Sequence, residues 1–103
     1  ITELLIKFRD ERDWAKFHTA KDLAVALNIE AAELLEAFLW KTSEQANLEQ
    51  VKEELADVIA YALLLAEKYD FDVRQMMVEK IERNAHKYPV AKSKGVAKKY
   101  TEL

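Results

Sequence analysis

The stretch that decides the fold is LAVALNIEAAELLEAFLW, residues 23–40. Its only charged residues are Glu30, Glu33 and Glu36. A helix that is apolar nearly all round lies inside a larger assembly rather than on its surface. The sequence therefore predicts a central helix over residues 20–40, with a few carboxylates embedded in it.

Two acidic pairs interrupt the apolar sequence, Glu30 with Glu33 and Glu54 with Asp57. A spacing of three places both members of a pair on one helical face. Carboxylates that converge between helices repel one another, at a cost of about a few kcal/mol per close pair. A divalent cation would remove this repulsion, and oxygen-only ligand sets suit Mg²⁺ or Mn²⁺. Ordinary surface carboxylates are the other interpretation, which fits Glu30 poorly because its neighbours on that face are apolar.

Start and stop signals predict an all-α chain, folded as one domain over residues 1–103. Thr19 with Asp22, Asn47 with Gln50 and Asp72 with Gln75 have the spacing of N-terminal caps. Pro89 ends the last helix. The predicted helices cover residues 2–16, 20–40, 48–69 and 73–87, a four-helix bundle followed by a tail over residues 90–103 without clear periodicity.

Composition narrows the class of protein. One Gly and one Pro in 103 residues predict few tight turns and argue against a β-rich fold. The absence of Cys excludes disulfides and thiolate metal sites and fits a cytoplasmic protein. No signal sequence and no apolar run of about 20 residues is present, so we expect neither secretion nor a membrane partner.

Charge is distributed unevenly. Residues 1–89 carry 12 basic and 18 acidic residues, whereas residues 90–103 carry four lysines and one glutamate. An acidic body argues against nucleic acid as a partner. The basic tail is either a solvated end or a segment that holds phosphates.

Other metal centres fit poorly. Di-iron bundles need Glu-x-x-His pairs, but Ala15 precedes His18 by three residues and Arg83 precedes His86. Two histidines without ligand spacing also argue against zinc.

Several aromatic and polar side chains accompany the acidic pairs. Trp14, Trp40 and Tyr61 are either core residues or a stacking surface for a nucleobase. His18 more often caps or hydrogen-bonds than catalyses. Lys80, Asn84 and Lys87 share one helical face, where Asn84 is the unexpected member.

Two consecutive helices this apolar predict a homo-oligomer, a symmetric dimer or a dimer of dimers, although a monomer with a well-filled core is the alternative.

The sequence resembles a known family in several segments. The acidic segments Glu30-Ala-Ala-Glu33-Leu-Leu-Glu36 and Glu54-Leu-Ala-Asp57-Val resemble the MazG-like all-α nucleoside triphosphate pyrophosphatases. The chain further resembles the dCTP pyrophosphatase branch in the segments Glu11–Trp14, Phe17-His18, Phe38–Lys41, Asp57–Tyr61, Arg83-Asn84, Tyr88-Pro89 and Lys99–Leu103. The resemblance covers nearly the whole chain. One departure is Leu5, which stands where that branch has a His.

The resemblance implies an activity and a site. Family members hydrolyse a (deoxy)nucleoside triphosphate to the monophosphate and pyrophosphate, and the dCTP branch forms tetramers with sites between subunits. The implied Mg²⁺ ligands are Glu30, Glu33, Glu54 and Asp57. The charge of a triphosphate leads us to expect two or more ions among these carboxylates. The implied nucleotide-binding residues are Trp14, His18, Trp40, Tyr61, Lys80 and Asn84, to which we add Lys87, Lys98 and Lys99 as phosphate-binding candidates.

We expect Glu33 or Glu36 to accept a proton from the attacking water. Removal of unwanted deoxynucleotides is the physiological role that the family implies. A dUTP-type or phosphoribosyl-ATP-type pyrophosphohydrolase and a non-catalytic helical module remain as alternatives.

Overall fold

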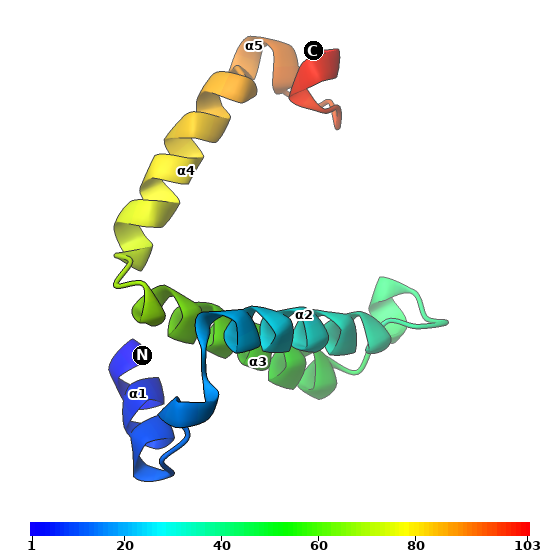
Figure 1. Ribbon diagram of the computed structural model, residues 1–103. Helices are drawn as coiled ribbons and strands as arrows, with labels where there is room; N and C mark the ends of the chain where they lie inside the picture. The colour runs from blue at the N-terminus through cyan, green and yellow to red at the C-terminus, as the bar shows by residue number, and fades with distance from the viewer. The chain divides into compact units, whose positions relative to one another are not determined.

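The computed structural model describes residues 1–103 and contains helices and no strand, which confirms the predicted all-α class. The chain forms two compact units, unit 1 over Ile1–Phe71 and unit 2 over Asp72–Leu103. Unit 1 holds the helices α1 (Thr2–Glu11), α2 (Ala20–Glu36) and α3 (Leu48–Lys68), with the 3₁₀ turns η1 (Ala15–Phe17) and η2 (Ser43–Gln45) (Figure 1). Unit 2 holds α4 (Val73–Lys87), α5 (Val90–Ser93) and the 3₁₀ turn η3 (Tyr100–Glu102). A single bundle of all four long helices stays a prediction.

The helix starts follow from side-chain caps. In each predicted start motif, a side-chain oxygen accepts a hydrogen bond from the backbone N–H three residues later. The pairs are Thr19 with Asp22 at 3.1 Å, Asn47 with Gln50 at 3.1 Å and Asp72 with Gln75 at 3.0 Å. The predicted first residues of α2, α3 and α4 are therefore confirmed.

Two predicted helix ends are wrong. The helix expected to reach Lys16 ends at Glu11, and the helix expected to reach Trp40 ends at Glu36. Tight turns follow these helices because Asp13 (φ 52°) and Trp40 (φ 62°) adopt the left-handed conformation. Residues other than glycine therefore make these two turns.

The end of α1 has the hydrogen-bond pattern of a Schellman motif. The N–H of Trp14 donates to the carbonyl of Arg9 at 3.1 Å, and the N–H of Asp13 donates to the carbonyl of Asp10 at 3.1 Å. The Trp14 ring then packs edge-on against Phe8, with ring centroids 5.7 Å apart. This turn, rather than a continuing helix, places the Trp14 side chain.

Within unit 1, α2 lies along α3, and α1 packs against α3 (Figure 1). The buried apolar residues are small in number: Leu23, Ala37, Ala46, Leu64 and Ala66. On α2, Val25, Ile29 and Leu35 keep about half or more of their surface exposed. The predicted central position of α2 is therefore not met within one chain, because only one of its sides is covered.

Unit 2 contains more structure than the sequence predicted for its tail. Beyond Pro89 the chain forms α5 and η3. The Tyr100 ring packs edge-on against Tyr88 at 6.2 Å between centroids, and the Lys87 ammonium lies 4.9 Å from the Tyr100 centroid. The last residues thus pack on the end of α4.

Candidate metal centre and adjoining pocket

Three carboxylates form an acidic cluster in unit 1: Glu30 and Glu33 from α2, and Glu54 from α3. One carboxylate oxygen of each lies within 4.8 Å of the others, and all three side chains are half-buried. The Oε2 atoms of Glu30 and Glu54 are buried without a hydrogen-bond partner. Buried carboxylate oxygens without partners are costly, so this cluster lacks a positive group.

The pKa values of two cluster members are raised, which also reflects the lack of a positive group in the cluster. The pKa of Glu30 is raised to about 7, first because its protonated carboxyl group donates a hydrogen bond to Glu33, and then by burial and the neighbouring charges. The pKa of Glu54 is raised by burial and then by repulsion from Glu33. A divalent cation would replace the proton and satisfy the free oxygens. The donor set therefore fits a divalent metal ion.

Asp57 lies one turn beyond Glu54 on α3 and is exposed. Its charge contributes to the raised pKa values of both Glu30 and Glu54. It is not part of the group of oxygens within 4.8 Å. Three of the four predicted ligands therefore lie together in the acidic cluster. The fourth, Asp57, lies outside it but close enough for its charge to act on Glu30 and Glu54.

Glu36 is the last residue of α2 and is exposed. Of the two predicted proton acceptors, Glu33 lies inside the acidic cluster and Glu36 lies outside it.

A cavity of about 270 Å³ adjoins Asp57; we call it the aromatic pocket. Its walls come from α1, the turn after α1, and α3: Leu5, Phe8, Arg9, Trp14, His18, Asp57, Ala60, Tyr61 and Leu64. The His18 and Tyr61 rings lie edge-on at 6.5 Å, and the Nδ1 atom of His18 is buried without a partner. The structure thus brings three predicted nucleotide-binding residues, Trp14, His18 and Tyr61, into one pocket. Asp57, whose charge acts on the acidic cluster, lines the same pocket.

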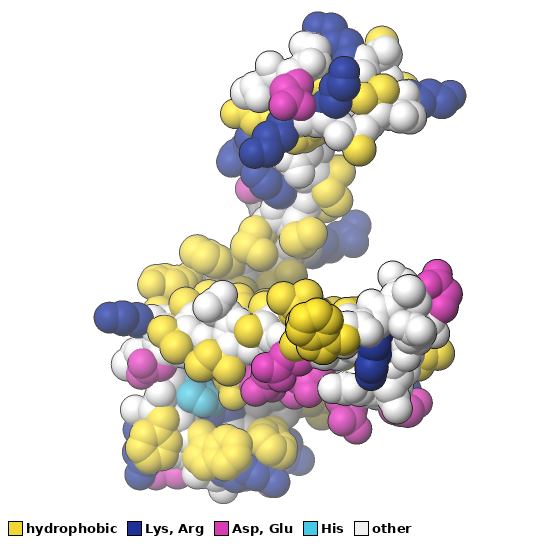
Figure 2. All heavy atoms as spheres, turned by 90° about the vertical axis from the view of Figure 1, so that its right-hand side faces the viewer, with side chains coloured by type: hydrophobic (Ala, Val, Ile, Leu, Met, Phe, Trp, Pro, Cys, Tyr) yellow, Lys and Arg dark blue, Asp and Glu magenta, His cyan; other side chains and the backbone are white.

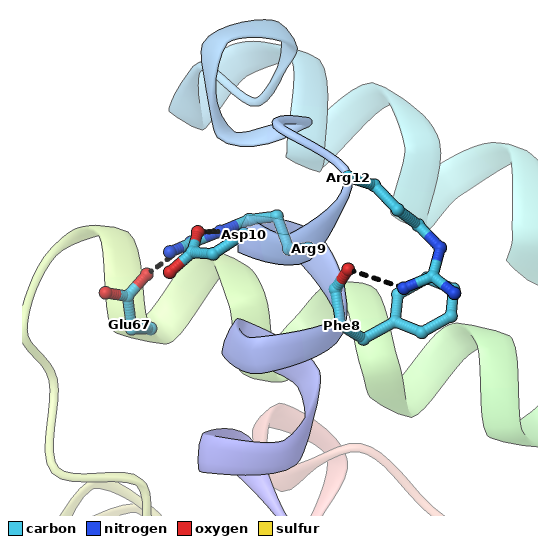
Figure 3. A network of polar contacts seen from close by, with 5 residues as sticks. All are labelled: Phe8, Arg9, Asp10, Arg12 and Glu67. Carbon is cyan, nitrogen blue, oxygen red and sulfur yellow. Dashed lines mark hydrogen bonds and ion pairs between the residues drawn. The ribbon is translucent and has the colours of Figure 1, made fainter.

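Phe8 and Arg9 are among the pocket residues that were not predicted from the sequence. Arg9 is buried, and its guanidinium forms ion pairs with Asp10 at 2.9 Å and with Glu67 of α3 at 3.1 Å (Figure 3). Leu5, Phe8 and Arg9 have the spacing of one helical face, which is the signal that could have found them. A charged residue on a short helix is ordinarily exposed, so the sequence did not predict Arg9 as a buried pocket residue.

The other predicted site residues lie elsewhere. Trp40 is 99% exposed after the end of α2. Lys80 lines a second cavity, of about 320 Å³, on α4 with Met76, Met77, Glu79 and Arg83. Asn84 accepts the N–H of Tyr88 through its backbone carbonyl, and Lys98 and Lys99 are exposed.

The two units differ in charge. Unit 1 carries eight basic and 15 acidic residues, whereas unit 2 carries eight basic and four acidic residues. On the face drawn in Figure 2, acidic side chains gather beside exposed apolar ones on unit 1, and Lys and Arg side chains are spread over unit 2. None of the helices combines the length and the apolar character that crossing a bilayer requires.

Comparison with known proteins places these features in a family. Residues 25–103 match the MazG-like family. The chain is 37% identical over 111 residues to dCTP pyrophosphatase 1 of Mus musculus, covering 100% of this chain and 65% of that protein. The human dCTP pyrophosphatase 1 is 34% identical over 111 residues, with 100% and 65% covered. The chain thus spans slightly less than two thirds of the length of these curated relatives.

A solved structure is similar as well. The crystal structure of a pyrophosphatase from Archaeoglobus fulgidus DSM 4304 superposes with a TM-score of 0.78 at 41% identity, covering 84% of this chain and 87% of that one. These matches confirm the resemblance predicted from the acidic and aromatic segments. The chain belongs to the MazG-like family.

Proposed function

We propose that the protein hydrolyses a (deoxy)nucleoside triphosphate, dCTP or a related deoxynucleotide, to the monophosphate and pyrophosphate. The observation that carries this proposal is the position of Asp57. Asp57 lines the aromatic pocket, and its charge contributes to the raised pKa values of Glu30 and Glu54 in the acidic cluster. The aromatic pocket therefore suits a base, and the acidic cluster near it suits metal-bound phosphates. The names of the mouse and human relatives support dCTP as the first substrate to test.

The residues proposed to hold the metal are Glu30, Glu33, Glu54 and Asp57, with two or more Mg²⁺ ions, or Mn²⁺, as the cofactor. Bound divalent cations would neutralise phosphate charge and lower the pKa of a bound water. The free Oε2 atoms of Glu30 and Glu54 support this assignment, because each lacks any other partner. Without a cation, four acidic side chains would repel a triphosphate.

The chain's own residues divide the remaining work. Trp14 and Tyr61 offer aromatic surface to the base, and base stacking on such surfaces contributes about 1–3 kcal/mol. His18 lines the same pocket, and its buried Nδ1 atom has no hydrogen-bond partner. Glu33, inside the acidic cluster, is the favoured acceptor of the water's proton, and Glu36 is the second candidate.

The phosphate end of the substrate needs cations from the protein as well. We propose that the cationic and amide side chains of unit 2 serve this purpose, from the same chain or from a second copy; they are Lys80, Asn84, Lys87, Lys98 and Lys99. The excess of basic residues in unit 2 supports this assignment. Trp40, fully exposed in one chain, is proposed to contact the nucleotide only in the assembled protein.

We further propose a homo-oligomer, with a dimer of dimers as the preferred form. The exposed apolar side chains of α2 and α3, among them Val25, Ile29 and Ile59, support it. Clearing excess or non-standard deoxynucleotides in the cytoplasm is the role that fits this activity, and it rests on the family relationship.

The test is pyrophosphate release from a panel of ribo- and deoxynucleoside triphosphates, with and without Mg²⁺. We expect Mg²⁺-dependent release that Glu33→Gln abolishes and that Glu49→Gln, an exposed carboxylate outside the cluster, leaves intact. A folded wild-type protein that turns over none of these nucleotides would instead favour a non-catalytic module.

A further inference from the structure

Arg9 is the only charged residue of the chain that is buried, with 9% of its surface exposed. It lies on α1 and forms part of the wall of the aromatic pocket. Its Nε atom lies 2.9 Å from Oδ1 of Asp10, and its Nη1 atom lies 3.1 Å from Oε2 of Glu67 (Figure 3). The two carboxylates fix the plane and the direction of the guanidinium group.

These two ion pairs do not use all of the hydrogen-bond donors. A guanidinium group has five N–H donors in a rigid fork. The two bonds of Arg9 with Asp10 and Glu67 are its only side-chain hydrogen bonds to the protein. Its Nη2 atom has no partner in the protein and is not among the fully buried atoms that lack one, so this end of the fork remains accessible to a ligand. The hydrogen bond with Asp10 also raises the pKa of Arg9, which keeps the group a donor.

The surrounding walls give this donor group a distinct role. On the α1 side, Leu5 and Phe8 line the pocket and offer no hydrogen bond. Asp57 is a hydrogen-bond acceptor whose charge acts on Glu30 of the acidic cluster. Arg9 is therefore the one permanently cationic donor in the pocket. A cavity of about 270 Å³ is slightly smaller than the roughly 300–1,000 Å³ of drug-sized sites, and so suits a single nucleobase.

We infer that Arg9 is a specificity-determining residue, donating hydrogen bonds to a nucleobase that carries a carbonyl oxygen beside an unprotonated ring nitrogen. Cytosine has this pair of acceptors at O2 and N3. Uracil and thymine carry a hydrogen on N3, so one donor of the fork would face another donor. This inference rests on the proposed function, and it makes Asp10 and Glu67 positioning residues that orient the fork.

The experiment compares dCTP with dUTP in wild-type protein and in Arg9→Met, which keeps the apolar stem and loses every donor. We expect kcat/KM for dCTP to fall roughly 10- to 100-fold, mostly through KM, and the dCTP-to-dUTP ratio to fall at least about tenfold. Arg9→Lys should recover part of the charge effect but not the ratio, because an ammonium lacks the fork. Lys7→Met is the matched control, because it removes the same positive charge from an exposed position on α1. It should leave both values unchanged.

A purely structural role of Arg9 gives a different result. The ion pair with Glu67 ties α1 to α3, so its loss could deform the pocket for every base. A lower Tm with equal losses of kcat/KM for dCTP and dUTP would assign Arg9 to that tie and overturn the inference. Glu67→Gln helps to separate the two, since its amide oxygen still accepts from Nη1 and should preserve most of the ratio.

Failure of the proposed function would be visible separately. If the wild-type protein released pyrophosphate from no nucleotide, calorimetric binding of dCMP and dUMP would still report on the base. Tighter binding of dCMP that Arg9→Met abolishes would support the inference without turnover. Undetectable or equal binding of the two monophosphates by the wild-type protein would overturn it.

Discussion

Glu30 and Glu33 lie one turn apart on α2, and a hydrogen bond between their carboxyl groups is the first cause of the raised pKa of Glu30, about 7. The folded protein thus holds a proton near neutral pH that an unfolded chain would release at about 4.5, the ordinary value for this carboxyl group. Below pH 4.5 both states are protonated. Between these two values only the unfolded state has lost the proton.

Stability without metal should therefore fall as the pH rises from about 5 to 7. The raised pKa means that the folded state binds more protons, so each rise in pH favours unfolding in this window. Thermal unfolding in EDTA at a series of pH values measures this. Glu30→Gln, which cannot lose a proton, should flatten the curve.

Added Mg²⁺ should reverse this trend at pH 8, because a cation stabilises the ionised cluster. A Tm that does not depend on Mg²⁺ at pH 8, together with an unchanged pH profile in Glu30→Gln, would contradict a metal site at the cluster.

Glu33→Gln should lower kcat by about 10²–10⁴-fold, since Glu33 is both a proposed ligand and the favoured proton acceptor. Glu36→Gln should cost much less because Glu36 is exposed outside the cluster. Steady-state pyrophosphate release, with circular dichroism to verify folding, measures both. A larger loss in Glu36→Gln would assign the proton transfer to Glu36.

Replacing Lys98 and Lys99 together by Met should raise KM about tenfold and leave kcat nearly unchanged. Both ammonium groups are exposed and form no ion pair within the chain. Added salt should raise the KM of the wild-type protein more than that of the variant, because salt screens the charges of these two lysines. Truncation after Pro89 is a blunter test, since it also removes Tyr100 from its contact with Tyr88. Identical KM values at low salt would exclude a phosphate-binding role for the tail.

Ile29→Glu should shift the protein toward smaller assemblies in light scattering behind size exclusion. Ile29 is 51% exposed in the single chain, and a charge there would have to be buried in an interface between copies. Lys21→Glu, an exposed residue earlier on α2, is the control. A wild-type protein that is already monomeric would rule out the oligomer directly.

Asp70→Gly should stabilise the protein by about 0.5–1 kcal/mol. Asp70 (φ 57°) closes α3 by a second Schellman motif, in which the N–H of Phe71 donates to the carbonyl of Ala66 at 2.9 Å. Glycine adopts this conformation without strain, whereas Asp70→Val should cost about 1–2 kcal/mol. Denaturant unfolding measures both; a destabilised glycine variant would mean that the Asp70 side chain has a contact of its own.

Helix starts could be predicted from the sequence, and two helix ends could not. Caps such as Thr19 act through a local hydrogen bond that the spacing to Asp22 reveals. The turns after α1 and α2 depend on left-handed residues at Asp13 and Trp40, where composition predicts continued helix. Such stops are decided by packing, as the contact of Trp14 with Phe8 shows.

The candidate site was predictable where chemistry is unusual for its surroundings. Carboxylates in apolar helices pointed to Glu30, Glu33 and Glu54, which the structure brings together. Arg9 escaped notice because its burial depends on Glu67, 58 residues later in the chain. Long-range pairs of this kind leave no local pattern.

The two tryptophans differ in exposure, 44% for Trp14 in the aromatic pocket and 99% for Trp40 beyond α2. The chain therefore carries two optical probes, of which Trp40 reports on assembly when no nucleotide is present. Quenching of Trp14 emission would report on a base entering the pocket, and a blue shift of Trp40 emission would report on loss of water when copies assemble. Single Trp→Phe variants would let the two processes be timed independently in one stopped-flow experiment.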